Sequence, residues 1–223
     1  MKTGRDNRGI MVAKIGGAGL IRDDDLAALG EWLSRMWTGG ARIVLVHGGG
    51  PEISALHQRL GLSVEKRDGL RVTTPEGMDA AAMVLSGLIK TRLVAHLVAA
   101  GLPAVGLSGV DDGLLRAPLF GAGELGRVGG TPRVRARLLE VLLDCRRLPV
   151  VAPISLGPDH RAVNVNADVA AGALAAALCA DTLDLVSDVP GILGQKGETL
   201  QKLTATDALE LTELPERIGV IGA

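Results

Sequence analysis

Short apolar runs alternate with longer segments of helical periodicity along this chain. The runs at 11–15, 43–46, 104–107, 150–154 and 183–187 predict strands. The segments 24–37, 51–60, 75–100, 134–145 and 167–180 predict helices. This alternation predicts an α/β fold, an open and mostly parallel sheet in a three-layer αβα sandwich. Ligands of such sheets bind at the carboxyl ends of the strands, so the residues that follow each strand are the candidates for chemistry.

Turn and cap residues agree with these boundaries. Pro51 suits the first turn of a helix, Thr74 is an expected N-cap, and Gly101 is placed to end the long helix. Residues 111–133 are rich in Gly, Pro and Arg and predict a loop or a β-hairpin. The G-x-G-x-x-G match at 121–126 follows no good strand and precedes no helix, so it is interpreted as a loop. One domain is the simplest division.

Composition excludes several classes of protein. The 223 residues carry 24 Lys and Arg against 25 Asp and Glu, so no positive excess is available for nucleic acid or an anionic membrane. Aromatic residues make up 1% of the chain, too few for base stacking. No signal peptide or membrane span is expected, and a cytoplasmic location follows. Cys145 and Cys179 lack metal or redox spacing and are expected to be buried, reduced thiols.

Glycines follow the first two predicted strands directly. Gly16 and Gly17 come after the first strand, and Gly48, Gly49 and Gly50 come after the second. Each turn places backbone N–H groups at a helix N-terminus, where an anion is favoured. Steric need alone explains one such turn, but two neighbouring turns could clasp a phosphate chain. Walker, serine-hydrolase and zincin motifs are absent from the sequence, and the histidines lack ligand spacing, so no protein metal site is predicted.

Two further polar features lie beside the predicted strand ends. Lys14 is a charge at the end of the apolar first strand, two residues before the glycine pair. Asn164, Asn166 and Asp168 occupy alternate positions before an apolar helix, although capping needs only one of them. We expect Asp168 to contact Lys14 at the carboxyl ends of adjacent strands, which leaves asparagine amides for a ligand.

Seven segments together point to a known family. They are KIGG (14–17), HGGGPEI (47–53), DGLRVT (68–73), AVGLSG (104–109), LPVVAP (148–153), NVNAD (164–168) and SDVPGI (187–192). The sequence resembles the amino-acid kinase superfamily, and within it the acetylglutamate kinases of arginine biosynthesis. The resemblance implies that N-acetyl-L-glutamate is phosphorylated on its side-chain carboxylate by ATP, with Mg²⁺ held mainly through the phosphates. It also implies a homodimer joined through the helix at 75–100.

The resemblance assigns roles to residues of this chain. Residues 1–180 would form the acyl-amino-acid-binding and dimerisation half, and 181–223 the start of the nucleotide-binding half. A carboxylate is already ionised at neutral pH, so the chemistry needs positive charge and no general base. The implied catalytic residues are Lys14, which stabilises the transferring phosphoryl group, and Asp168, which orients Lys14. The implied substrate-binding residues are Gly48, Gly49, Arg71 and Asn164, and the implied nucleotide-binding residues are Gly16, Gly17, Ser187, Asp188, Val189, Pro190, Gly191 and Ile192.

The sequence departs from the family pattern in one segment, and two alternatives to an acetylglutamate kinase stay open. Family members continue with a Gly-Gly-Met-x-x-Lys segment whose lysine approaches the phosphates from the other side, and none precedes Ala223 here. We therefore expect this chain to bind acetylglutamate but to turn ATP over poorly. The alternatives are a kinase that acts on carrier-linked aminoadipate in lysine biosynthesis, with the arginines of 116–137 as a basic entrance, and a non-catalytic ligand-binding subunit.

Overall fold

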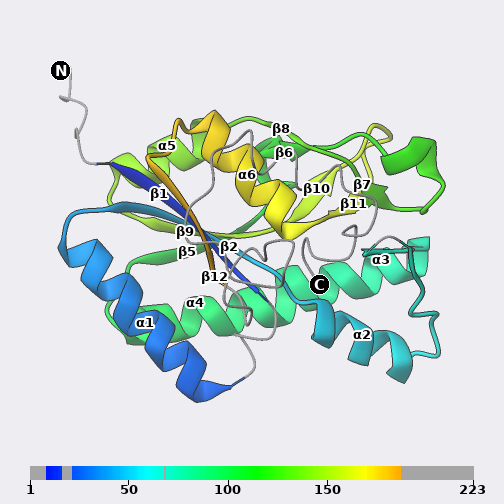
Figure 1. The fold of residues 1–223 in the computed structure, drawn as a ribbon, viewed down its shortest axis with the longest axis horizontal. Coiled ribbons are helices and arrows are strands. Elements are labelled where there is room, and N and C mark those ends of the chain that lie inside the picture. The colour runs from blue at the N-terminus through cyan, green and yellow to red at the C-terminus, as the bar shows by residue number, and fades with distance from the viewer. Residues whose placement is uncertain (1–8, 17–21, 68, 187–223) are drawn as a thin grey trace, which may run out of the picture.

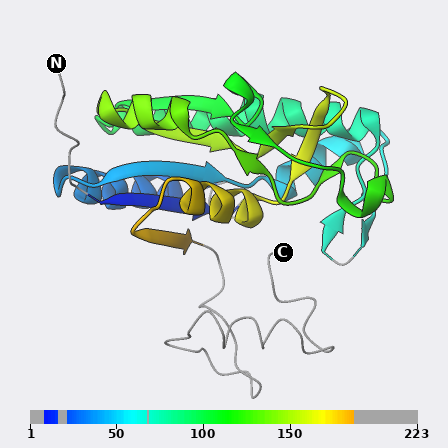
Figure 2. The ribbon, with the colours of Figure 1, turned by 90° about the horizontal axis from the view of Figure 1, so that it is seen from above.

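A five-stranded parallel sheet forms the centre of the protein. The computed structural model describes residues 9–16, 22–67 and 69–186. The strands are β1 (Ile10–Ile15), β2 (Arg42–His47), β5 (Ala104–Ser108), β9 (Leu148–Ala152) and β12 (Thr182–Val186), in the order β12-β1-β2-β9-β5. All five lie where the apolar runs predict strands. The α/β fold class is thereby confirmed, and β12 is an edge strand beside β1 (Figure 2).

Helices cover both faces of this sheet. Helices α1 (Asp23–Thr38) and α4 (Lys90–Ala99) lie on one side, and α5 (Arg137–Asp144) and α6 (Ala167–Ala177) lie on the other (Figure 1). Successive side chains of a strand point to opposite faces. Ile43 and Leu45 therefore belong to the core on the α4 side, whereas Val44 and Val46 belong to the core on the α6 side. Burial on both faces explains why the central strands β1, β2 and β9 are largely apolar runs, whereas the edge strand β12 is mostly exposed.

The helix expected at 75–100 contains a π-helical segment. Its parts are α3 (Pro75–Ala82), the π-helix η2 (Met83–Ile89) and α4. As expected, Thr74 caps its start by accepting a hydrogen bond of 3.0 Å from the Gly77 amide, and Gly101 follows its end with φ +81°. By length and composition the helix could cross a membrane. Its buried residues Leu93 and Leu97 pack against the sheet.

A second, smaller sheet carries the polar segment before α6. Its strands are β6 (Leu115–Arg116), β7 (Val128–Gly129), β8 (Arg133–Val134), β10 (Ile154–Leu156) and β11 (Ala162–Val165), in the order β7-β11-β10-β6-β8. The run at 150–154 does not form one strand: it contains the end of β9 and the start of β10, because the chain passes between the two sheets at Pro153, which has no N–H to donate. Residues 121–126 enter no strand–turn–helix unit, which agrees with the loop interpretation.

Two short elements complete the described part of the chain near the carboxyl end of β2. Helix α2 (Gly50–Arg59) follows β2 directly, and the hairpin of β3 (Lys66–Arg67) and β4 (Leu70–Arg71) leads into α3. Backbone hydrogen bonds from Thr73 N to Leu125 O (2.9 Å) and from Arg127 N to Thr73 O (2.6 Å) attach this region to the loop before β7.

The expectation that both cysteines are buried is wrong. Cys145 and Cys179 are free thiols, and both are exposed. Cys145 is the C-cap of α5, and Cys179 follows the C-cap of α6 with φ +48°. Both therefore lie just beyond the last helical turn, where the apolar face of the helix has ended.

Candidate active site

Lys14 and Asp168 form a largely buried ion pair. The Lys14 side chain projects from β1 to the face covered by α6, and its Nζ lies 3.0 Å from Oδ1 of Asp168. Their side chains are 9% and 22% exposed, so solvent screens the pair only in part. The expected contact is present. Asp168 does not end a strand adjacent to β1, however; it lies in the first turn of α6, which follows β11 of the second sheet.

Asn164, Asn166 and Asp168, around the start of α6, make different contacts. Asn166 is the N-cap, since its Oδ1 accepts hydrogen bonds from the amides of Asp168 (2.8 Å) and Val169 (3.2 Å). Asp168 is thereby left for Lys14. The half-buried Asn164 lies in β11. Its backbone amide donates to Arg127 O (2.8 Å), whereas its side-chain amide forms no hydrogen bond with a described residue. One asparagine does suffice for the cap, as the sequence predicts.

The glycine turn after β2 leaves two amides free. Gly48 N donates to Ile15 O (2.9 Å), and Gly48 O accepts a hydrogen bond from the His47 ring (3.0 Å). Gly49 O accepts from Ile53 N (3.0 Å), and Gly50 O accepts from Nη2 of Arg71 (3.1 Å). No described residue accepts from the amides of Gly49 and Gly50. The turn therefore presents two neighbouring donors at the N-terminus of α2, an arrangement that favours an anion.

This accounting corrects part of the sequence-based expectation. The Gly48 amide is not a free donor, because it extends the ladder between β1 and β2. The Gly16 amide is likewise engaged, since it donates to Val186 O at the end of β12 (2.9 Å). The Gly50 amide, which the resemblance does not assign, is free in its place. Gly17 and the segment Ser187–Ile192 lie outside the described residues.

Gly49 is held by close packing against the long helix. A Cβ at this position would lie 2.3 Å from Cδ1 of Ile89 and 2.7 Å from Cδ2 of Leu85, both in the π-helical segment. Those side chains are 0% and 2% exposed. The π-helix therefore brings two core side chains directly onto the turn, a placement for which no sequence signal was found.

His47 is a buried neutral imidazole beneath the turn. Burial lowers its pKa to about 4; the hydrogen bond to the Gly48 carbonyl opposes this shift, and the charge of Lys90 adds to it. A carbonyl oxygen can only accept, so Nδ1 of the neutral ring carries the proton and donates it to Gly48. Nε2 is then a buried acceptor without a partner among the described residues.

Arg71 contacts the turn through its guanidinium group. Its Nη2 donates to Gly50 O (3.1 Å) and to Oγ of Ser54 (2.7 Å), while its Nη1 is buried without a described acceptor. Burial lowers the pKa of the guanidinium from its usual value. An unpaired donor on a buried cation is costly, so this nitrogen calls for an anionic partner. The Arg127 backbone, bonded to both Thr73 and Asn164, connects the Arg71 segment to β11.

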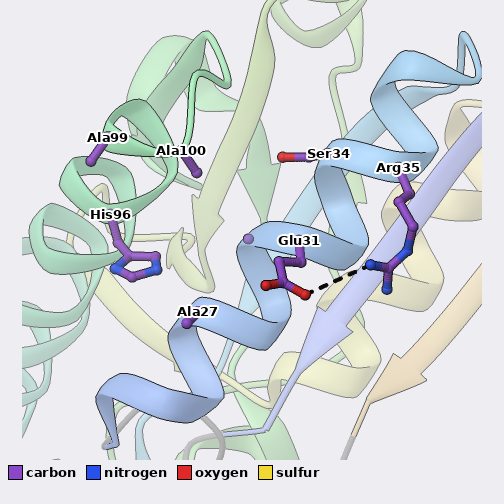
Figure 3. Close-up of a pocket in the computed structure, with 8 residues that line it drawn as sticks. Ala27, Glu31, Ser34, Arg35, His96, Ala99 and Ala100 are labelled. Carbon is purple, nitrogen blue, oxygen red and sulfur yellow. Dashed lines mark ion pairs between the residues drawn. The ribbon is translucent and has the colours of Figure 1, made fainter.

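A hollow between α1 and α4 lies apart from these residues. Its walls are formed largely by small side chains of the two helices (Figure 3). A Cβ added at Gly30 would lie 3.5 Å from Cβ of Ala100. Glu31 and Arg35 on its rim are 3.8 Å apart but 76% and 65% exposed, so their ion pair is screened by solvent. The residues that line the hollow do not include a buried side-chain donor without a described partner, such as Nη1 of Arg71 near the carboxyl end of β2.

Comparison with known proteins identifies the family. The chain matches the Amino acid kinase family over residues 9–218 and belongs to that family. Two acetylglutamate kinases are close relatives. The protein from Methanopyrus kandleri is 46% identical over 91% of this chain and 82% of its own, and that from Roseiflexus is 47% identical over 91% and 76%.

Solved structures give the same family fold. The smu.665 structure from Streptococcus mutans UA159 has a TM-score of 0.78 at 31% identity, with 90% of this chain and 81% of that chain covered. An N-acetylglutamate synthase from Neisseria gonorrhoeae, solved with coenzyme A and N-acetyl-glutamate, has a TM-score of 0.78 at 24% identity and shares the fold over 92% of this chain and 47% of its own.

Proposed function

We propose that this chain is an acetylglutamate kinase that transfers the γ-phosphoryl group of ATP to the side-chain carboxylate of N-acetyl-L-glutamate. Its relatives of that name, 46% and 47% identical over 91% of the chain, support this substrate. The observation that carries the proposal is a pair of amides, at Gly49 and Gly50, without acceptors among the described residues. They follow β2, which pairs with β1, the strand that carries Lys14 and its ion pair with Asp168.

Lys14 and the free amides are suited to phosphoryl transfer between two anions. The acceptor carboxylate is ionised at neutral pH, so the site needs to neutralise charge rather than remove a proton. The Lys14 ammonium group has three N–H donors, so beside its ion pair with Asp168 it can also donate to phosphate oxygens. Asp168 fixes the position of that ammonium group. The amides of Gly49 and Gly50 then stabilise the charge that develops during transfer.

Arg71 and Asn164 are proposed to bind the amino-acid substrate. The unpaired Nη1 of Arg71 suits the α-carboxylate, since a guanidinium matches a carboxylate geometrically. The free side-chain amide of Asn164 suits the acylated amino group, because it both donates and accepts. Gly48 contributes to this half of the site by holding the turn in place.

The nucleotide and its metal ion fit the same arrangement. ATP supplies the phosphoryl group, and Mg²⁺ offsets the negative charge of its phosphates. Among the described residues, no group of three His, Cys, Asp or Glu side chains could hold a metal ion. Mg²⁺ binds readily with few protein ligands and several phosphate oxygens and waters, so this donor set is compatible with it. We propose that the nucleotide binds to Gly16, Gly17 and the segment Ser187–Ile192. The proposed location of the protein is the cytoplasm.

A homodimer through the long helix is also proposed. Met83, Leu88 and Val98 on this helix are 65%, 55% and 54% exposed. Large apolar side chains on one helix whose other face covers the sheet are typical of a subunit interface.

Purified protein assayed with Mg-ATP tests the function. Hydroxylamine traps the acyl phosphate product, and coupled ADP release measures turnover. We expect both signals to require N-acetyl-L-glutamate and to be weaker with L-glutamate or α-aminoadipate. ADP release that is independent of acetylglutamate would refute the assignment, and calorimetric binding of acetylglutamate without turnover would favour the non-catalytic ligand-binding alternative.

A further inference from the structure

We propose that His47 is a positioning residue that aims the Gly49 amide into the site by holding the Gly48 carbonyl. The inference rests on the proposed function, because it concerns a donor to the transferring phosphoryl group. His47 itself is fully buried and contacts no substrate.

One peptide unit joins Gly48 to Gly49. Its carbonyl belongs to Gly48 and its N–H belongs to Gly49. All described peptide bonds are trans, so the C=O and N–H of one unit point in opposite directions. The 3.0 Å hydrogen bond from Nδ1 of His47 fixes the carbonyl. The same bond therefore directs the Gly49 amide away from the His47 ring.

The direction of the Gly49 amide can be related to the two faces of the sheet. Along β2, Ile43 and Leu45 point to the α4 side, and His47 continues this alternation. Its pKa is influenced by Lys90 of α4, which agrees with that placement. Lys14 points to the opposite side, where it meets Asp168 of α6. An amide turned away from His47 is thus turned toward the side of the catalytic lysine.

Glycine makes this restraint necessary. Residue 48 or 49 could otherwise rotate its peptide unit at low steric cost, which would exchange the amide donor for a carbonyl acceptor at the anion site. A carbonyl there would repel phosphate oxygens. His47 is suited to prevent this rotation, because burial keeps its ring neutral and its single proton is committed to the Gly48 oxygen.

Two variants of His47, whose new side chains are similar to each other in shape, test the proposal. In His47→Asn the side-chain nitrogen occupies the place of Nδ1 and can still donate to the Gly48 carbonyl. In His47→Leu a methyl group takes that place. The apolar surroundings favour leucine for stability, so a merely structural role predicts that the leucine variant performs at least as well as the asparagine variant.

The positioning role predicts the reverse order in kcat. We expect His47→Leu to lower kcat by about 10²-fold or more, as for the loss of one preorganised donor. His47→Asn should remain within about tenfold of the parent, since it keeps the donor, and KM for acetylglutamate should change little in either variant. Calorimetry with ADP and aluminium fluoride in the presence of acetylglutamate should show the same order, because this complex mimics the transferring phosphoryl group.

Each remaining outcome is decisive. Equal kcat values for the two variants, or a higher value for leucine, would overturn the proposal. If His47→Leu does not fold, His47→Gln replaces it, because its amide lies one carbon further out and cannot take the place of Nδ1; a kcat equal to that of His47→Asn would also overturn the proposal. A parent protein without acetylglutamate-dependent turnover would instead refute the proposed function.

Discussion

Replacing Gly49 by alanine tests whether the glycine turn is held by packing. The new Cβ would lie 2.3 Å from Cδ1 of Ile89 and 2.7 Å from Cδ2 of Leu85. Carbon atoms in ordinary contact are about 3.5–4.0 Å apart, so the methyl group overlaps both side chains by roughly 1 Å. Backbone strain does not contribute, because φ of Gly49 is 170°, an extended value that any residue adopts. The effect of the substitution is therefore steric.

The expected loss of stability follows from where those side chains lie. Leu85 and Ile89 are buried in the core on the α4 side, so they can move only by displacing their neighbours. Overpacking of such a core costs about 1–3 kcal/mol. Movement of the turn by about 1 Å would also misplace the Gly49 amide, and misplacement of this size costs about 10²-fold in rate.

Gly50→Ala is the matched control for stability. No heavy atom of a described residue lies within 4 Å of its added Cβ, and Gly50 is already the first residue of α2. Alanine is the better helix former, so this variant should range from unchanged to about 1 kcal/mol more stable. Urea unfolding followed by circular dichroism should separate the two variants by about 1–4 kcal/mol. Equal unfolding midpoints would refute the packing argument.

Three further changes test the remaining parts of the site. Arg71→Lys removes the unpaired Nη1, so calorimetry should show acetylglutamate affinity reduced about tenfold or more while ATP affinity is nearly unchanged; unchanged acetylglutamate affinity would remove Arg71 from the site. Asp168→Asn releases Lys14, so kcat should fall about 10²-fold with little change in KM; an unchanged kcat would refute the orienting role. Combined Met83→Lys and Leu88→Lys substitutions should convert the dimer to monomers in light scattering, whereas a monomeric parent protein would contradict the proposed interface.

The centre of the main sheet could be predicted from sequence because β1, β2 and β9 are buried on both faces, which produces apolar runs. The edge strand β12 is mostly exposed and contains Asp184, so its apolar run is weaker. The second sheet left no such signal. Its strands β6, β7 and β8 have two residues each, too few to show any periodicity, and they are recognisable only through partners distant in sequence.

The chemistry of the site could be predicted only in part, for a similar reason. Residue types and spacing were enough to expect the Lys14–Asp168 contact, because a buried lysine needs a charged partner. The sequence does not show which backbone amides lack an acceptor. Whether an amide is free depends on its tertiary partners, and the acceptor of Gly48 is Ile15 on a neighbouring strand. The role of His47 is equally dependent on the fold, because it arises from burial and a single carbonyl contact.

The charge of the site is local rather than global, and this explains the role of Asp168. The whole chain carries a formal net charge of −1, so its overall field does not attract two anionic substrates. Among the described residues, we propose that the attraction comes from Lys14, Arg71 and the N-terminus of α2. A lysine that is 7% exposed has lost most of its contact with water, so its charge requires a partner within the protein. Asp168 is this partner at 3.0 Å, and in the proposed function the ammonium group still offers N–H donors to phosphate oxygens.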